Sequence, residues 1–325
     1  MRAVVTGGAG FIGHHIVRAL LERGDEVAVI DDLSTGFAWR LDEVRQGIEF
    51  VEGSILDAAA LDRVMVGAEV VFHQAAIPSV ARSVLDPRSS NIANVDGTIE
   101  LMLAATRHGV RRVLYAGSSS VYGVPKELPC VETMRASPMS PYGASKLAAE
   151  HYVHTLGALH GVETVVLRYF NVFGPGQDPT SEYSAVIPRF VTATLEGRRP
   201  TINGNGEVSR DFTYVDNVVA GNLLGASPSS PTGITCNVAC GARYDLIELL
   251  ETIGDAAGQR VEPIFGPPRP GDIVHSQADI SLARSALGYE PIVPFREGIA
   301  RTVAWYREHR GDPALVSGGS TSPRA

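Results

Sequence analysis

The chain has 325 residues, of which 44% are hydrophobic, 20% charged and 7% aromatic, a composition typical of globular proteins. Its length allows one large α/β domain or two coupled domains. The net charge of −8 excludes a strong overall attraction to nucleic acid or anionic lipid, so we expect neither a nucleic-acid nor a membrane partner. Three cysteines are too few for a disulfide framework, and the sequence shows neither a targeting segment nor an apolar stretch of bilayer length. These features predict a cytoplasmic protein.

The first half of the chain alternates short β-branched runs with stretches of helical spacing. Residues 2–6 and 26–30 are strand-like, and residues 11–22 between them have the spacing of a helix. Further buried strands are expected at 48–51, 70–72, 113–115 and 165–167. Such alternation predicts a Rossmann-type, doubly wound parallel sheet, with six or seven strands by about residue 168.

After Asn171, glycine- and proline-rich turns break the chain into short pieces. We expect a cofactor-binding domain at 1–170 and a smaller α/β substrate domain at 171–213 and 241–310. The two are interleaved, because a predicted helix at 214–224 and a predicted strand at 235–239 look like returns to the main sheet. Residues 311–325 lack periodicity and apolar content and are predicted to be disordered.

A glycine-rich turn, T-G-G-A-G-F-I-G at 6–13, joins the first predicted strand to the first helix. Gly7 permits a tight turn, Gly10 lets the backbone approach a pyrophosphate, and Gly13 lets the helix pack against the strand. The helix N-terminus, with Phe11 and Ile12, faces the anion. Such a pattern is often an ordinary loop, but its place between a strand and a helix favours dinucleotide binding.

Asp31 lies at the end of the second predicted strand, 18 residues beyond Gly13. A carboxylate there accepts hydrogen bonds from both hydroxyls of the adenosine ribose and repels a 2'-phosphate. The alternative is a solvated loop acid like its neighbour Asp32. The position of Asp31 and the glycine turn both fit a dinucleotide site, so we favour a ribose-binding carboxylate. This predicts that the protein uses NAD and not NADP.

Tyr142 and Lys146 are four residues apart, which places a phenol and an ammonium on one face of a helix. A cation there lowers the pKa of the phenol, so that tyrosine can act as a base near neutral pH. The same spacing occurs on ordinary surface helices. Ser118 and Ser119 follow the fifth strand, at the edge where doubly wound sheets bind ligands, and this context favours a catalytic site over a polar turn.

In these features the sequence resembles the extended short-chain dehydrogenase/reductases, and among them the nucleotide-sugar epimerases typified by UDP-glucose 4-epimerase. The resemblance covers residues 2–308. Beyond the glycine turn and Asp31, it rests on F-H-Q-A-A at 72–76, N-V-D-G-T at 94–98, S-S-S-V-Y-G at 118–123, S-P-Y-G-A-S-K at 140–146, R-Y-F-N-V-F-G-P at 168–175, S-R-D-F-T-Y-V at 209–215 and R-P-G-D at 269–272.

The resemblance implies a role for individual residues. Tyr142 is the implied base. Lys146 is implied to lower the pKa of Tyr142 and to bind the nicotinamide ribose. Ser118 is implied to supply the hydroxyl that relays or positions the proton of the sugar 4-OH. Further implied contacts to NAD are Ser54, Ile55, Gln74, Ala75 and Ala76, although Ser54 stands where the family usually has aspartate. The implied contacts to a UDP-sugar are Ser118, Ser119, Asn171, Arg210, Arg269, Asp272 and Ser276. Two arginines, Arg210 and Arg269, would hold the diphosphate, and Asp272 the uridine ribose.

The family also implies a homodimer formed by helices near 80–108 and 140–160. His73, by contrast, is expected to be a hydrogen-bonded core histidine.

The reaction follows from what the segment 119–121 lacks. Related dehydratases and decarboxylases have an acidic residue there, and this chain has none, which favours an epimerase. Ser276 stands where glucose-restricted relatives carry tyrosine, and a serine leaves room for an N-acetyl group at C2. We therefore expect NAD-dependent 4-epimerisation of UDP-GlcNAc and UDP-GalNAc, with UDP-Glc and UDP-Gal as further substrates. The alternatives are a UDP-glucuronate 4-epimerase, a nucleotide-sugar dehydratase and a non-catalytic NAD-binding sensor.

Overall fold

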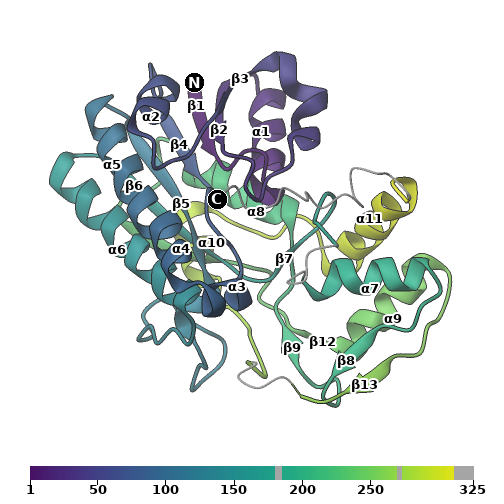
Figure 1. Cartoon of the computed structure of the whole chain (residues 1–325). Helices are drawn as coiled ribbons and strands as arrows, with labels where there is room; N and C mark the ends of the chain where they lie inside the picture. Colours follow the sequence, from purple (N-terminus) through teal and green to yellow (C-terminus); the bar gives the residue numbers. More distant parts are fainter. Residues whose placement is uncertain (180–184, 269–272, 311–325) are drawn as a thin grey trace.

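A seven-stranded parallel sheet forms the centre of the larger part of the protein (Figure 1). This computed structural model describes residues 1–179, 185–268 and 273–310. The strand order is β11-β6-β5-β4-β1-β2-β3. The strands are β1 (Arg2–Thr6), β2 (Glu26–Asp31), β3 (Ile48–Glu52), β4 (Val70–His73), β5 (Arg112–Ser118), β6 (Glu163–Tyr169) and β11 (Ile234–Val238). The predicted Rossmann-type α/β fold is confirmed. Six strands precede residue 170, and the seventh, β11, joins the edge of β6 from much later in the chain.

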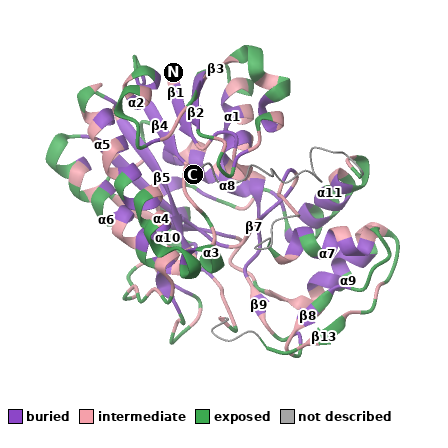
Figure 2. Ribbon diagram, in the orientation of Figure 1, coloured by how far each residue is buried: buried purple, intermediate pink, exposed green. Residues whose placement is uncertain are grey.

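Helices cover both faces of this sheet. Because side chains alternate along a strand, Ala3 and Val5 of β1 pack in one hydrophobic cluster and Val4 in another. The first cluster includes residues of α1 (Phe11–Glu22), α8 (Val215–Gly225) and α10 (Ser281–Leu287). The second includes residues of α2 (Ala58–Val64), α5 (Gly97–Arg107) and α6 (Pro141–His160). Burial on both faces explains why β1, β2 and β4 are almost wholly buried, as Figure 2 shows, whereas the edge strand β3 carries two glutamates and is partly exposed.

The remaining helical segments before β6 are η1 (Ala38–Gly47), α3 (Val80–Leu85), α4 (Pro87–Asn91), the π-helical turn η2 (Ile92–Asp96) and η3 (Ser119–Tyr122). None of the helices in the described part of the chain is long and apolar enough to cross a membrane.

A second lobe lies beside the sheet and has its own hydrophobic cluster (Figure 1). Its helices are α7 (Val186–Leu195), α9 (Leu246–Ala257) and α11 (Phe295–Glu308). Its short strands pair as β7 (Val172–Phe173) with β10 (Thr213–Tyr214), β9 (Ser209–Arg210) with β12 (Tyr244–Asp245), and β8 (Thr201–Asn203) with β13 (Ile264–Gly266). Between its segments the chain returns to the sheet through α8, which packs on α1, and through β11.

The strand order reverses between β1 and β4. The chain runs outward from β1 to β3, then crosses back to β4 and continues to β6. In doubly wound sheets, ligands bind at the carboxyl edge beside such a switch point. The glycine turn after β1, Asp31 at the end of β2, Gln74 after β4 and Ser118 at the end of β5 all lie at this edge.

Candidate active site

The glycine turn leaves no room for side chains. Gly7 has φ +67°, and a Cβ on it would lie 2.7 Å from the backbone nitrogen of Ala75. A Cβ on Gly10 would lie 2.9 Å from the carbonyl oxygen of Gly7, and one on Gly13 would collide with the same oxygen. Gly10 is the N-cap of α1, and no side chain among the described residues caps this helix. The first-turn amides of Phe11 and Ile12 can therefore point at an anion, as a pyrophosphate requires.

Asp31 is buried against this turn. Its Oδ2 accepts a hydrogen bond from the Ala9 amide at 2.9 Å, and its Oδ1 accepts one from the Leu33 amide at 2.8 Å. Burial raises the pKa of Asp31, while these two hydrogen bonds lower it. Each carboxylate oxygen has a further lone pair, which suits a pair of ribose hydroxyls.

The loops after β3 and β4 hold the other residues expected to contact the cofactor. The hydroxyl of Ser54 accepts a hydrogen bond from the Leu56 amide at 3.2 Å, and Ile55 is buried. The Gln74 side chain donates to the Tyr169 hydroxyl at 3.2 Å, and the Ala75 amide donates to Thr6 Oγ1 at 3.2 Å. The Gln74 amide group is therefore engaged within the protein. Ala76 follows in the same loop.

Ser118 and Tyr142 meet at the carboxyl edge of β5. Tyr142 lies in the first turn of α6, where Ser140 caps the helix by accepting from the Gly143 amide at 3.1 Å. Hydrogen bonding to the Ser118 side chain lowers the pKa of Tyr142, so the two hydroxyls are neighbours. Ser118 also accepts from the Ser120 amide at 3.2 Å and so caps η3, which begins at Ser119.

Lys146 lies one turn after Tyr142 and is buried, with its Nζ 4.3 Å from the centroid of the Tyr115 ring. Burial lowers the pKa of Lys146 to about 7, and the carboxylate of Glu150 opposes that shift. The expected lowering of the Tyr142 pKa by Lys146 is wrong for the protein alone. Burial raises the pKa of Tyr142, and only the hydrogen bond with Ser118 opposes it. The physical reason is that burial lowers the pKa of Lys146 so far that Lys146 is already neutral where the phenol loses its proton.

Two buried interactions hold α6 in place. Glu150 forms a bidentate pair with Arg168 of β6, with Nη2 to Oε1 at 2.6 Å and Nε to Oε2 at 3.0 Å. Asn94, in the π-helical turn η2, donates to Ser145 Oγ at 3.0 Å, and its Oδ1 accepts from the Ile77 amide at 2.8 Å. The turn bearing Tyr142 and Lys146 is therefore fixed against both β6 and the loop after β4.

His73, at the end of β4, is a buried core histidine as expected. Its Nδ1 lies 2.8 Å from Thr6 Oγ1 and its Nε2 lies 2.9 Å from Thr98 Oγ1. Because the Thr98 hydroxyl donates to the Asn94 carbonyl at 2.7 Å, Nε2 carries the proton and donates to Thr98.

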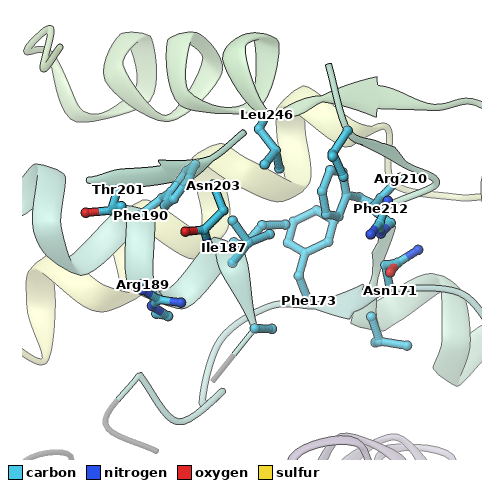
Figure 3. A pocket seen from close by; sticks show the side chains of 14 residues that line it. Asn171, Phe173, Ile187, Arg189, Phe190, Thr201, Asn203, Arg210, Phe212 and Leu246 are labelled. Carbon is cyan, nitrogen blue, oxygen red and sulfur yellow. The ribbon is translucent and has the colours of Figure 1, made fainter. Parts of the chain in front are cut away.

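The second lobe contains a pocket of about 270 Å³ (Figure 3). Asn171 and Arg210 lie at one end, and the aromatic rings of Phe173 and Phe212 form part of its wall. Its full lining is Asn171, Val172, Phe173, Ala185, Val186, Ile187, Arg189, Phe190, Thr201, Asn203, Val208, Arg210, Phe212 and Leu246. Such a mixture of apolar walls and a few polar groups is typical of small-molecule sites.

Asn171 connects this pocket to the sheet. It has φ +35°, and its Nδ2 donates to the Asp211 carbonyl at 3.0 Å. Arg210 donates through Nη1 to the carbonyls of Ser209, at 3.0 Å, and of Val274, at 3.2 Å. The backbone amide of Ser276 donates to the Ser209 carbonyl at 3.1 Å, so Ser276 lies beside β9 but outside the pocket lining. Arg269 and Asp272 lie outside the described residues.

Sequence reasoning missed Tyr115, Arg189 and Asn203. Tyr115 lies in an apolar run, Arg189 in α7 and Asn203 at the end of β8, and no motif marks any of them. Within the described residues, no group of His, Cys, Asp and Glu side chains is arranged to hold a metal ion.

The parallel sheet, the glycine turn, the buried acid after β2 and the Ser118, Tyr142 and Lys146 group define a dinucleotide-dependent enzyme of the short-chain dehydrogenase/reductase class. Residues 3–239 match the model of the NAD dependent epimerase/dehydratase family, and the chain belongs to this family. The predicted cofactor, NAD, is confirmed, and the turn and Asp31 fit it.

Individual relatives resemble almost the whole chain. A UDP-glucose 4-epimerase from Mycolicibacterium smegmatis is 41% identical, over 94% of this chain and 99% of that protein. A UDP-N-acetylglucosamine 4-epimerase from Methanobrevibacter ruminantium, solved with UDP-N-acetylmuramic acid, is 38% identical with a TM-score of 0.90, covering 95% of this chain and 98% of that one. A Thermus thermophilus UDP-glucose 4-epimerase, solved with NAD, is 37% identical with a TM-score of 0.87, covering 94% and 99%.

Proposed function

We propose that the protein is an NAD-dependent 4-epimerase of a UDP-hexose, with UDP-GlcNAc and UDP-GalNAc as its main substrates and UDP-Glc and UDP-Gal as further ones. The observation that carries this proposal is the grouping of Ser118, Tyr142 and the buried Lys146 at the carboxyl edge of the sheet. It supplies a base and a relay where a sugar hydroxyl would meet the nicotinamide. The relatives named above, which are 4-epimerases, support the same activity.

In the proposed reaction, Tyr142 removes the proton of the sugar 4-OH, directly or through Ser118. NAD, when bound, would supply the acceptor and then the donor of the C4 hydride, so that C4 is inverted and the cofactor is regenerated in each cycle. Lys146 binds the nicotinamide ribose, and Tyr142 returns its proton to the new 4-OH. The positive charge of the oxidised nicotinamide would lower the pKa of Tyr142, which burial alone raises.

The cofactor would be held by the amides of Phe11 and Ile12 and by the carboxylate of Asp31. The amides would bind its pyrophosphate, and Asp31 its adenosine ribose. Since a 2'-phosphate would face a buried carboxylate that the amides of Ala9 and Leu33 already fix, NADP should bind poorly.

The pocket of the second lobe is the proposed site of the UDP group. Arg210 and Asn171, which lie together at one end of the pocket, would contact the diphosphate, and the aromatic walls would enclose the base. Residues 171–213 and 241–310 would thus form the substrate domain, and Arg269 and Asp272 would complete the site. The sugar preference depends on Ser276, which is small and lies beside β9 and Arg210.

We further propose a homodimer. Five large apolar side chains are exposed on α3 and α6, which pack against each other: Val80, Val84, Leu85, Tyr152 and Leu159. Exposed apolar side chains gathered on neighbouring helices are typical of an interface, and a second copy of the chain is the proposed partner. Light scattering at micromolar concentration should give twice the chain mass of 34.6 kDa, and a monomeric mass would contradict the proposal.

Product analysis by NMR with UDP-GlcNAc, UDP-Glc and UDP-glucuronate tests the reaction and the sugar together. We expect conversion of UDP-GlcNAc into its C4 epimer, with no net consumption of NAD. Turnover of UDP-glucuronate alone would replace the proposed substrate, and a 4-keto-6-deoxy product would identify a dehydratase. Binding of NAD without turnover of any of these sugars would favour the non-catalytic sensor.

A further inference from the structure

Arg40 is an arginine buried between the two lobes. It lies in η1, after β2, and is 3% exposed. Its guanidinium carbon lies 4.7 Å from the ring centroid of Phe37 and 5.4 Å from that of Trp39, and Trp39 in turn stacks on Trp305 of α11. A buried arginine needs several acceptors, because each unpaired N–H would be costly.

Those acceptors belong to two distant parts of the chain. Nη1 donates to the carbonyl of Ala9 at 3.1 Å. Nε and Nη2 both donate to the carbonyl of Gly176, at 3.1 and 2.6 Å. Ala9 is part of the glycine turn, and its amide donates to Asp31. Gly176 lies in the loop that follows β7. One rigid guanidinium therefore joins the cofactor turn to this loop.

The loop is held at three consecutive carbonyls. His15 of α1 contacts the carbonyl of Pro175 through Nε2 at 3.0 Å, Arg40 binds that of Gly176, and Tyr306 of α11 donates to that of Gln177. Gly176 has φ +76°, and a Cβ on it would lie 3.1 Å from the His14 ring. Of these three side chains, Arg40 is the one that also hydrogen-bonds a carbonyl of the cofactor turn, whereas His15 is connected to that turn through α1.

The same loop leads directly to the proposed nucleotide pocket. Asn171, Val172 and Phe173 line the pocket, and they precede Pro175 and Gly176 by only a few residues. Burial lowers the pKa of Arg40 to about 10, with Asp178, Tyr306 and Asp31 opposing the shift, so the guanidinium keeps its charge at neutral pH. A movement of either lobe would stretch charge-assisted hydrogen bonds that are buried away from solvent.

We propose that Arg40 is a positioning residue that couples the cofactor site to the nucleotide-sugar site. A nucleotide in the pocket fixes the loop of Gly176, which fixes Arg40 and, through it, the turn at Ala9. The planar guanidinium can do this because its donors are set at fixed angles, whereas a lysine ammonium presents a single point charge. This inference rests on the proposed binding of UDP in the second lobe.

The test measures how far UDP slows the exchange of NAD. Holoenzyme carrying labelled NAD is chased with excess unlabelled NAD, with and without saturating UDP, and the ratio of the two exchange rates reports the coupling. Couplings between sites typically amount to about 5- to 150-fold. In the wild type we expect UDP to slow exchange about tenfold or more. In Arg40→Met the ratio should fall to within about twofold of one.

Two further variants separate coupling from general loosening. Arg40→Lys keeps the charge but cannot reach both carbonyls, so its ratio of exchange rates should also fall. If Arg40→Met does not fold, Arg40→Lys is the variant that tests the coupling. Tyr306→Phe removes the bond to the Gln177 carbonyl in the same loop without touching the cofactor turn. This control should raise KM for the UDP-sugar and keep the wild-type ratio.

Calorimetric titration of the wild type with UDP distinguishes the two ways of failing. Absence of UDP binding would overturn the proposed function, and this inference with it. If UDP binds, a wild-type ratio of one, or a wild-type ratio in a folded Arg40→Met or Arg40→Lys, would overturn the coupling through Arg40.

Discussion

Lys146 faces Tyr115: its ammonium lies 4.3 Å from the centroid of that ring. In the described part of the chain, the buried hydroxyl of Tyr115 has no hydrogen-bond partner. Tyr115 therefore interacts with Lys146 through the face of its ring. A cation over an aromatic face is stabilised in its charged form. Burial lowers the pKa of Lys146 to about 7, and the ring of Tyr115 therefore helps to retain a proton that would otherwise be lost more readily.

Replacement of Tyr115 by leucine should move the alkaline limb of the kcat profile to lower pH, by about 0.5 pH unit or more, because the charged form of Lys146 loses its aromatic partner. Tyr115→Phe keeps the ring and should leave that limb in place. A pH series of initial rates for both variants checks this. An unchanged limb in a folded Tyr115→Leu would show that the ring does not tune Lys146.

Tyr142→Phe keeps the ring and deletes the hydroxyl that Ser118 contacts. We expect kcat to fall about a hundredfold or more, since general base catalysis contributes about 10²- to 10⁴-fold, while the affinity for UDP stays nearly unchanged. Steady-state kinetics and UDP titration provide the comparison. Retained turnover would remove Tyr142 from the mechanism. Ser118→Ala should cost less than Tyr142→Phe if tyrosine reaches the 4-OH directly.

Asp31→Asn should weaken the preference for NAD over NADP, because the amide removes the charge that repels a 2'-phosphate. The amide keeps one oxygen to accept from the Ala9 or Leu33 amide, so the turn should remain formed. Parallel titrations of wild type and variant with both cofactors measure the change. Similar affinities of the wild-type protein for NAD and NADP would count against the assignment.

His73 should make the protein less stable in mild acid. Burial lowers its pKa to about 3, with the charge of Lys146 as the second cause, whereas the unfolded chain takes up a proton near pH 6.5. The contribution of His73 is therefore present above pH 6.5 and is lost as the pH falls toward 3, by at most about 1.4 kcal/mol per pH unit. Denaturant unfolding of His73→Gln between pH 7 and 4 should show a shallower decline than the wild type. Equal slopes would contradict the assignment.

Ser276→Tyr tests the sugar preference. If Ser276 borders the C2 substituent, a tyrosine ring at this position would collide with the N-acetyl group of UDP-GlcNAc, at a cost of about 1 to 3 kcal/mol. The smaller C2 hydroxyl of UDP-Glc would still fit. The ratio of kcat/KM for UDP-GlcNAc to that for UDP-Glc should then shift at least about tenfold toward glucose. Equal losses on both sugars would place C2 away from Ser276.

The sequence could predict those features of the site that depend on residues close together in the chain. The glycine turn, Asp31 and the group of Ser118, Tyr142 and Lys146 depend on spacings within one strand, turn or helix, and the structure brings them to one edge. The pairing of Arg40 with Gly176, 136 positions later, has no local signal. The same is true of Lys146 over Tyr115, because the i, i+4 rule describes neighbours on a helix and not the strand beneath it. The pKa shift of Tyr142 was mispredicted because burial, which the spacing does not reveal, determines the pKa values of both Tyr142 and Lys146.

The late arrival of β11 has a consequence for how the protein is made. A fragment ending at residue 170 would contain six strands and the whole glycine turn, but the outer edge of β6 would lack its neighbour. Unpaired strand edges invite aggregation, and a nascent chain on the ribosome exposes this edge until residues 234–238 emerge. Synthesis of the cofactor-binding half alone should therefore yield insoluble material, and the minimal folding unit must extend through Val238.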